Sequence, residues 1–183
     1  MKRSVLLYLF FISASLQAQE AIPGLGDILQ WAIPAAGVGL SLAHEDPNGG
    51  GWVDREGLAQ FAKSYGTTIA VTYAGKYGLD TERPNGGSHS FPSGHAASAF
   101  AGASYIQRRY GWGWGAPAYV AAGYTGYSRV ANDAHYERDV IAAAAIATMS
   151  SYFFVDRYEK NDFQVSAYVP EEGGFGVQLG WKF

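Results

Sequence analysis

The sequence predicts an all-α fold, a bundle of about five helices with a β-hairpin appended at its C-terminal end. Long runs of small and apolar residues alternate with short loops rich in glycine, proline and polar residues, and capping residues precede several of these runs. Residues 163–183 instead alternate apolar and polar side chains, a pattern typical of strands. The change of period near residue 160 therefore separates a helical domain from its extension.

The composition limits the class of protein. At 183 residues, the chain is long enough for one domain with a substantial core. Hydrophobic residues make up 48% of it and charged residues only 16%, a low charged share for a soluble domain. A net charge of −3 argues against a nucleic-acid partner, because binding of that kind needs a basic surface. The absence of cysteine excludes disulfides and thiolate metal sites.

Residues 1–18 predict a secretory signal peptide. Lys2 and Arg3 precede an apolar run over residues 5–12, and small or polar residues follow up to Ala18, where we expect cleavage. The alternative is an uncleaved membrane anchor, although the run is shorter than the ~20 apolar residues that a spanning helix needs. We expect export across the inner membrane to the periplasm or cell envelope, and contact with a membrane surface stays open.

Residues 19–160 are expected to form the helical domain. The first helix is predicted over residues 26–43, interrupted by Pro34. The second is predicted to begin at Asp54, a natural N-cap, and to end near Glu82. Further helices are predicted from Ser93 to the Arg108–Arg109 pair, over residues 116–127, and over residues 139–155.

Lys76 and Arg83 are predicted to share one face near the end of the second helix. Seven residues in a helix rise by about 10 Å, or two turns. Because Arg83 precedes Pro84, its backbone is disfavoured in helical geometry, and the helix should end there. Both cations would then point into one space.

Ser93 is predicted to cap the next helix, with His95 in its first turn. A helix N-terminus presents unpaired N–H groups and the positive end of the helix dipole, which together favour an anion. His95 should therefore lie beside any anion that binds there. His89, in the preceding glycine-serine loop, is expected on an exposed rim, with contact to the substrate as the alternative. The stretch from Tyr110 to Gly115 fits a membrane-interface belt and an ordinary aromatic loop equally well.

Residues 161–183 are predicted to form the hairpin. Apolar residues at every second position flank a turn at residues 170–174. A single hairpin cannot form a barrel and is not stable alone. We expect a flap packed on the helices, and contact with a membrane or pairing with another chain is the alternative.

Three short polar groups stand out between residues 76 and 139. They supply three cations, two histidines, a hydroxyl, and a carboxylate four residues after a histidine. This combination suits a phosphate ester, because cations can hold the phosphoryl oxygens while one imidazole attacks and another protonates the leaving oxygen.

These groups resemble the signature of the type 2 phosphatidic acid phosphatase/haloperoxidase superfamily. That signature reads Lys, six residues, Arg-Pro; then Pro-Ser-Gly-His; then Ser-Arg, five residues, His, three residues, Asp. The chain contains every one of these residues in order: Lys76, Arg83, Pro84, Pro92, Ser93, Gly94, His95, Ser128, Arg129, His135 and Asp139.

The resemblance implies a metal-independent acid phosphatase without a cofactor, acting on phosphate monoesters, lipid phosphates or pyrophosphates. By the same resemblance, His135 is the nucleophile that becomes phosphohistidine, Asp139 orients it, and His95 is the general acid and later the base. The phosphoryl group would be held by five residues: Lys76, Arg83, Ser93, Gly94 and Arg129.

Other interpretations stay open. A vanadate-dependent haloperoxidase would use the same cradle, although such enzymes tend to be far larger. His95, His135 and Asp139 could be three metal ligands. A non-catalytic envelope protein that binds lipid or a partner is a further alternative. The family's membrane members usually carry six spanning helices, so about five glycine-rich helices leave the membrane topology undecided.

Overall fold

A helix rich in alanine, glycine and serine lies at the centre of the fold. In the computed structural model, which describes residues 24–48, 50–159, 163–168 and 175–181, α3 (Gly94–Tyr110) contacts each of the other four helices. Its small side chains let neighbouring backbones come close. A Cβ on Gly102 would lie 2.6 Å from the backbone nitrogen of Pro34 in α1 (Leu25–Ala43), so only glycine fits there.

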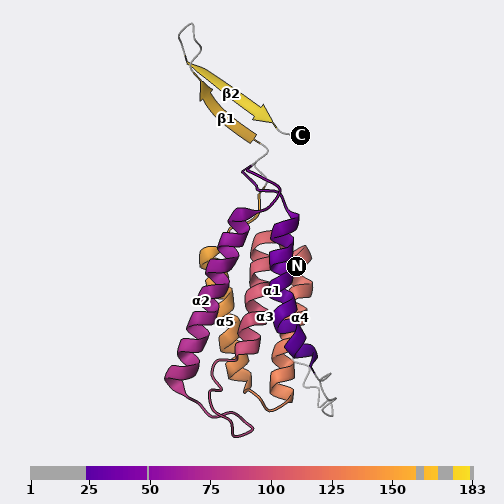
Figure 1. The fold of residues 1–183 in the computed structure, drawn as a ribbon, viewed down its shortest axis with the longest axis vertical. Helices are drawn as coiled ribbons and strands as arrows, with labels where there is room; N and C mark the ends of the chain where they lie inside the picture. Colours follow the sequence, from indigo (N-terminus) through magenta and orange to yellow (C-terminus); the bar gives the residue numbers. More distant parts are fainter. Residues whose placement is uncertain (1–23, 49, 160–162, 169–174, 182–183) are drawn as a thin grey trace, which may run out of the picture.

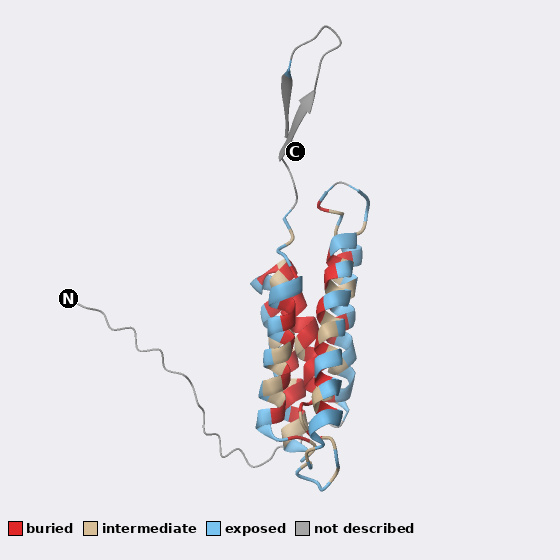
Figure 2. Ribbon diagram, turned by 90° about the vertical axis from the view of Figure 1, so that its left-hand side faces the viewer, coloured by how far each residue is buried: buried red, intermediate tan, exposed pale blue. Residues whose placement is uncertain are grey.

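Successive helices run in opposite directions (Figure 1). α1 is followed by α2 (Arg55–Leu79), α3, α4 (Trp112–Ala131) and α5 (Glu137–Phe154). The buried residues face one another along the length of the bundle (Figure 2). Consequently the first turns of α1, α3 and α5 meet the last turns of α2 and α4 at one end of the bundle.

The prediction of an all-helical bundle with five helices is confirmed for the described residues up to 159. Pro34 does not break the first helix, because α1 continues through it. The predicted end of α2 near Glu82 is wrong. The helix ends at Leu79, since Asp80 takes a left-handed conformation with φ 37°. Arg83 therefore lies in a loop and not on the helix face of Lys76.

The aromatic-glycine stretch at residues 110–115 is helical except at Gly111 and does not form a loop. Gly111 alone separates α3 from α4, whose first turn contains Trp112 and Trp114. Both tryptophans are more than half exposed, and Trp112 stacks on Tyr119 with ring centroids 5.9 Å apart. A role at a membrane interface stays a prediction.

Two strands follow the helices. β1 (Phe163–Tyr168) pairs antiparallel with β2 (Gly176–Trp181), with Phe163 opposite Trp181. The turn between them and both ends of the segment lie outside the described residues, and so does the signal peptide at residues 1–18. The hairpin and its flap role therefore stay predictions.

Among the described helices, α1 is the one long and apolar enough to cross a membrane by length and composition. Core helices of soluble proteins pass the same test. The observation alone therefore does not place the chain in a membrane.

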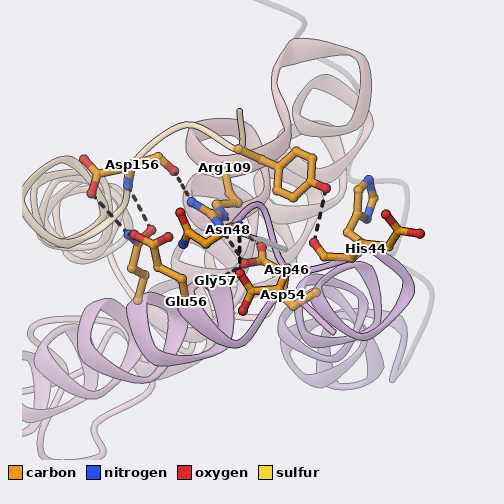
Figure 3. A network of polar contacts seen from close by, with 12 residues as sticks. His44, Asp46, Asn48, Asp54, Glu56, Gly57, Arg109 and Asp156 are labelled. Carbon is orange, nitrogen blue, oxygen red and sulfur yellow. Dashed lines mark hydrogen bonds and ion pairs between the residues drawn. The ribbon is translucent and has the colours of Figure 1, made fainter. Parts of the chain in front are cut away.

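A buried ion pair joins α3 to the start of α2 at the other end of the bundle (Figure 3). The guanidinium of Arg109 in α3 donates from Nη2 to Oδ1 of Asp54, over 2.7 Å, and from Nε to Oδ2, over 2.9 Å. Asp54 also caps α2 by accepting from the backbone N–H of Gly57, and it accepts from the hydroxyl of Tyr110. Burial alone would raise the pKa of Asp54, but the bonds from Arg109 and Gly57 outweigh it and hold that pKa below its usual value.

Candidate active site

A pocket of about 790 Å³ opens at the end of the bundle where α1, α3 and α5 begin. The residues that the sequence assigned to the site converge on it, although they come from four helices and the loops that follow α2 and α4. Six of them line the pocket: Lys76, Arg83, Gly94, His95, Arg129 and His135. The side chains of Ser93 and Asp139 are fully buried behind its wall.

His135 lies in the turn before α5 with its side chain only 3% exposed. Its Nδ1 lies 3.5 Å from Oδ2 of Asp139 and 3.5 Å from Oγ of Ser90. With Nδ1 turned toward these groups, Nε2 is the nitrogen left for a ligand. Burial, together with the charges of Lys76 and Arg83, lowers the pKa of His135 to about 4, so the ring is neutral above that pH.

Asp139 is held by more partners than His135. Its Oδ2 accepts a 2.5 Å hydrogen bond from the Ser90 hydroxyl and a 3.0 Å bond from the backbone N–H of Tyr136, the N-cap residue of α5. The backbone N–H of Ser93 donates to the Asp139 carbonyl, which ties the start of α3 to α5. Ser90 is thus a site residue that sequence reasoning missed, and nothing in its local pattern distinguishes it from the neighbouring loop serines.

Ser93 acts as the N-cap of α3, as predicted from its position. Its Oγ accepts from the backbone N–H of Ala96 over 3.4 Å. Because this hydroxyl is buried and turned toward the helix, it does not line the pocket. Gly94, one residue later, does line the pocket.

Two of the three cations are held by backbone carbonyls of the loop between α2 and α3. Lys76, in the last turn of α2 and only 8% exposed, donates to the carbonyl of His89 over 2.6 Å. Arg83 donates from Nε to the carbonyl of Ser88 over 3.0 Å. Burial and the nearby Arg83 lower the pKa of Lys76, while Asp139 opposes the shift. The loop thereby fixes both cations at the pocket.

The third cation pairs with a residue of α1. Arg129, in the last turn of α4, donates from Nε to Oγ of Ser128 and from Nη1 to Oδ1 of Asp27 over 2.9 Å. The same Oδ1 lies 3.0 Å from Nε2 of His95. Burial and the charge of Arg129 lower the pKa of His95, whereas Asp27 raises it.

His89 lies at the pocket rather than on an outer rim. Its ring is half-buried, packs edge-on against Tyr77 with centroids 4.9 Å apart, and places Nδ1 3.3 Å from Asp80. Both His89 and Asp80 adopt positive φ, which bends the loop back over the end of α2.

The arrangement does not match a metal centre. Over the described ranges, which include His95, His135 and Asp139, no group of three or more His, Asp or Glu side chains is close enough to hold a metal ion. The geometry instead places cations, a neutral imidazole and the N-terminus of α3 around one hollow, an arrangement suited to an oxyanion.

Residues 55–163 match the family model of the PAP2 superfamily, and the chain belongs to that superfamily. The resemblance drawn from the signature residues is therefore confirmed. The match includes α2 to α5 and leaves out α1.

Two curated relatives are lipid A phosphatases. The lipid A 4'-phosphatase of Helicobacter pylori is 33% identical over 167 residues, which cover 87% of this chain and 84% of that protein. The lipid A 1-phosphatase of Porphyromonas gingivalis is 40% identical over 81 residues, which are 42% of this chain but only 18% of the relative's length. With the family, these relatives support a phosphoric monoester hydrolase.

Solved structures share the fold. The crystal structure of Aquifex aeolicus LpxE aligns with a TM-score of 0.56 at 17% identity, covering 73% of this chain and 86% of that one. A transmembrane PAP2 type phosphatidylglycerolphosphate phosphatase from Bacillus subtilis aligns with a TM-score of 0.52 at 20% identity, covering 72% and 75%. At these identities the likeness concerns the fold alone.

Proposed function

We propose that this protein is a metal-independent phosphatase that hydrolyses the phosphate monoester of a lipid through a phosphohistidine on His135. The observation that carries the proposal is the composition of the pocket. Its cationic part continues into a wall of aromatic and aliphatic side chains from α1 and α2: Trp31, Tyr65, Ile69, Tyr73 and Tyr77. A ligand with a phosphate at one end and apolar chains at the other matches both parts.

The proposed reaction has two steps. Nε2 of neutral His135 attacks phosphorus while His95 gives a proton to the leaving oxygen, and the P–O bond breaks as the P–N bond forms. His95 then takes a proton from water, which attacks the phosphohistidine and releases phosphate. The two arginines, Lys76 and the N–H groups at the start of α3 stabilise the charge that develops on the equatorial oxygens.

The substrate class is tested with a panel assayed in chelator. We expect turnover of lipid A phosphomonoesters or phosphatidic acid, with pyrophosphate and p-nitrophenyl phosphate as smaller references. Trp31→Ala should raise KM for the lipid about fivefold, or about 1 kcal/mol of lost apolar contact, and leave the small ester unchanged. Trp52→Ala, an exposed tryptophan in the loop between α1 and α2, is the matched control. Equal rates for lipid and small esters would argue against a lipid substrate, and vanadate-dependent bromide oxidation would favour the haloperoxidase.

The rate should depend on pH in a bell shape on the acid side of neutrality. His135 must be neutral to attack, so kcat/KM should rise with pH through its pKa of about 4. His95 must be protonated to act as the acid, so kcat/KM should fall as pH rises through the His95 pKa, which lies below its ordinary value of 6.5. Initial rates between pH 3 and 9 on a soluble alkyl phosphate, whose alkoxide leaving group needs a proton, measure both limbs at about half-unit steps. A rate that keeps rising above neutrality would reverse these assignments.

A further inference from the structure

The first turn of α1 places a half-exposed carboxylate against two residues of the site. Oδ1 of Asp27 lies 2.9 Å from Nη1 of Arg129 and 3.0 Å from Nε2 of His95, so one oxygen bridges two residues of the site. Asp27 precedes residues 55–163, the part of the chain that the family model matches, and it belongs to none of the signature groups. Its position is therefore a property of how α1 packs in this chain.

The packing of α1 holds this carboxylate in place. A Cβ on Gly26 would collide with Oγ of Ser128 and lie 3.1 Å from Nη2 of Arg129, so glycine lets α1 touch the end of α4. On the other side, the Ser98 hydroxyl of α3 donates to the carbonyl of Gln30 over 2.6 Å. Because both contacts are within one turn of Asp27, the carboxylate is presented by a fixed helix end.

The bridge determines which nitrogen of His95 can face a substrate. Nε2 points to Asp27, which leaves Nδ1 for the leaving oxygen. The other charges that face His95 are cationic and disfavour its protonated form: Arg129 of α4 and Arg83 of the loop after α2, with Lys76 of α2 and His135 before α5 lining the same pocket. Among the described residues whose charge acts on His95, Asp27 is the anion.

We propose that Asp27 is a positioning residue that holds His95 through Nε2–H, favours the protonated ring against the site's cations, and braces Arg129. This inference rests on the proposed function, because it assigns the acid in that reaction. In the transfer, the Nδ1–H bond of the imidazolium breaks and its proton goes to the leaving oxygen. The neutral ring that remains keeps its proton on Nε2, hydrogen-bonded to Asp27. This is the tautomer in which Nδ1 can take a proton from water.

The test compares Asp27→Asn and Asp27→Ala with Glu137→Gln, which removes an exposed carboxylate from the first turn of α5. Hydrolysis is measured on two soluble esters, p-nitrophenyl phosphate and an alkyl phosphate, because only the alkoxide leaving group needs a proton. We expect Asp27→Ala to lower kcat about tenfold on the alkyl ester and less than about threefold on the nitrophenyl ester. The tenfold loss is smaller than the full contribution of a general acid, because His95 itself remains. The basic limb of the pH profile should move to lower pH in Asp27→Asn.

A measurement without turnover separates this inference from the proposed function. The ring protons of the chain's four histidines are titrated by NMR, with His95 assigned from its own variant. We expect the His95 midpoint to fall by about half a unit or more in Asp27→Asn and to stay in place in Glu137→Gln. An unchanged His95 titration, or equal losses on both esters, would overturn the role of Asp27. If the wild-type protein hydrolyses neither ester, the proposed function fails while the titration still decides whether Asp27 controls His95.

Discussion

Replacement of His135 by alanine is expected to abolish turnover, with a loss on the order of 10⁴-fold or more, as for the removal of a covalent nucleophile. The reason is geometric, since Nδ1 is directed toward Asp139 and Ser90 and only Nε2 remains to attack phosphorus. Rapid quench with a ³²P-labelled ester should trap an acid-labile, base-stable phosphoenzyme in the wild-type protein and none in the variant.

His44 provides the matched control for that experiment. It is also a histidine at a helix end, where Nδ1 lies 2.8 Å from the carbonyl of Leu40, but it is at the opposite end of the bundle from the pocket. His44→Gln should keep the phosphoenzyme and most of the rate. Turnover that persists in His135→Ala, with normal circular dichroism in both variants, would mean that another residue is the nucleophile.

Replacement of Arg109 by methionine is expected to destabilise the fold by about 3–5 kcal/mol, because it leaves the carboxylate of Asp54 buried without its partner. Asp54 is 0% exposed and Arg109 1% exposed, so water cannot replace the lost bonds. Asp54→Asn should also destabilise strongly, although asparagine can still cap α2. Urea unfolding followed by circular dichroism measures both changes.

The double variant tests whether the pair acts as a unit. Asp54→Asn combined with Arg109→Met should lose less stability than the sum of the single changes, by about 0.5–3 kcal/mol. Arg55→Met, at an exposed arginine in the first turn of α2, should change stability by less than about 0.5 kcal/mol. Strict additivity would show that the two side chains stabilise the bundle independently.

Much of the site could be predicted from the sequence because its chemistry is concentrated in short segments. The spacing of the three polar groups identified the family, and Ser93 before a run of small residues identified the start of α3. The position of Arg83 could not be predicted in the same way. The left-handed turn at Asp80 ends α2 early, and the loop carbonyl of Ser88 then directs the guanidinium.

Residues that act across the bundle left no signal in the sequence. Ser90 bonds to Asp139, and Asp54 bonds to Arg109, over separations of 49 and 55 residues. Each lies in a segment whose local pattern predicts only a loop or a helix cap. Asp27 likewise reads as an ordinary acidic residue in a first helical turn, a position that the helix dipole already favours.

The sequence by itself determined the number of helices in the bundle, the caps at Asp54 and Ser93, and the reactive residue types, because propensity, capping and motif spacing all operate within a few turns of chain. The tertiary structure decided which helix ends meet, through close approaches such as Gly102 on Pro34 and Gly26 on Ser128. Those contacts depend on the packing of distant backbones against one another. They bring Asp27 to His95, and local sequence carries no information about that distance.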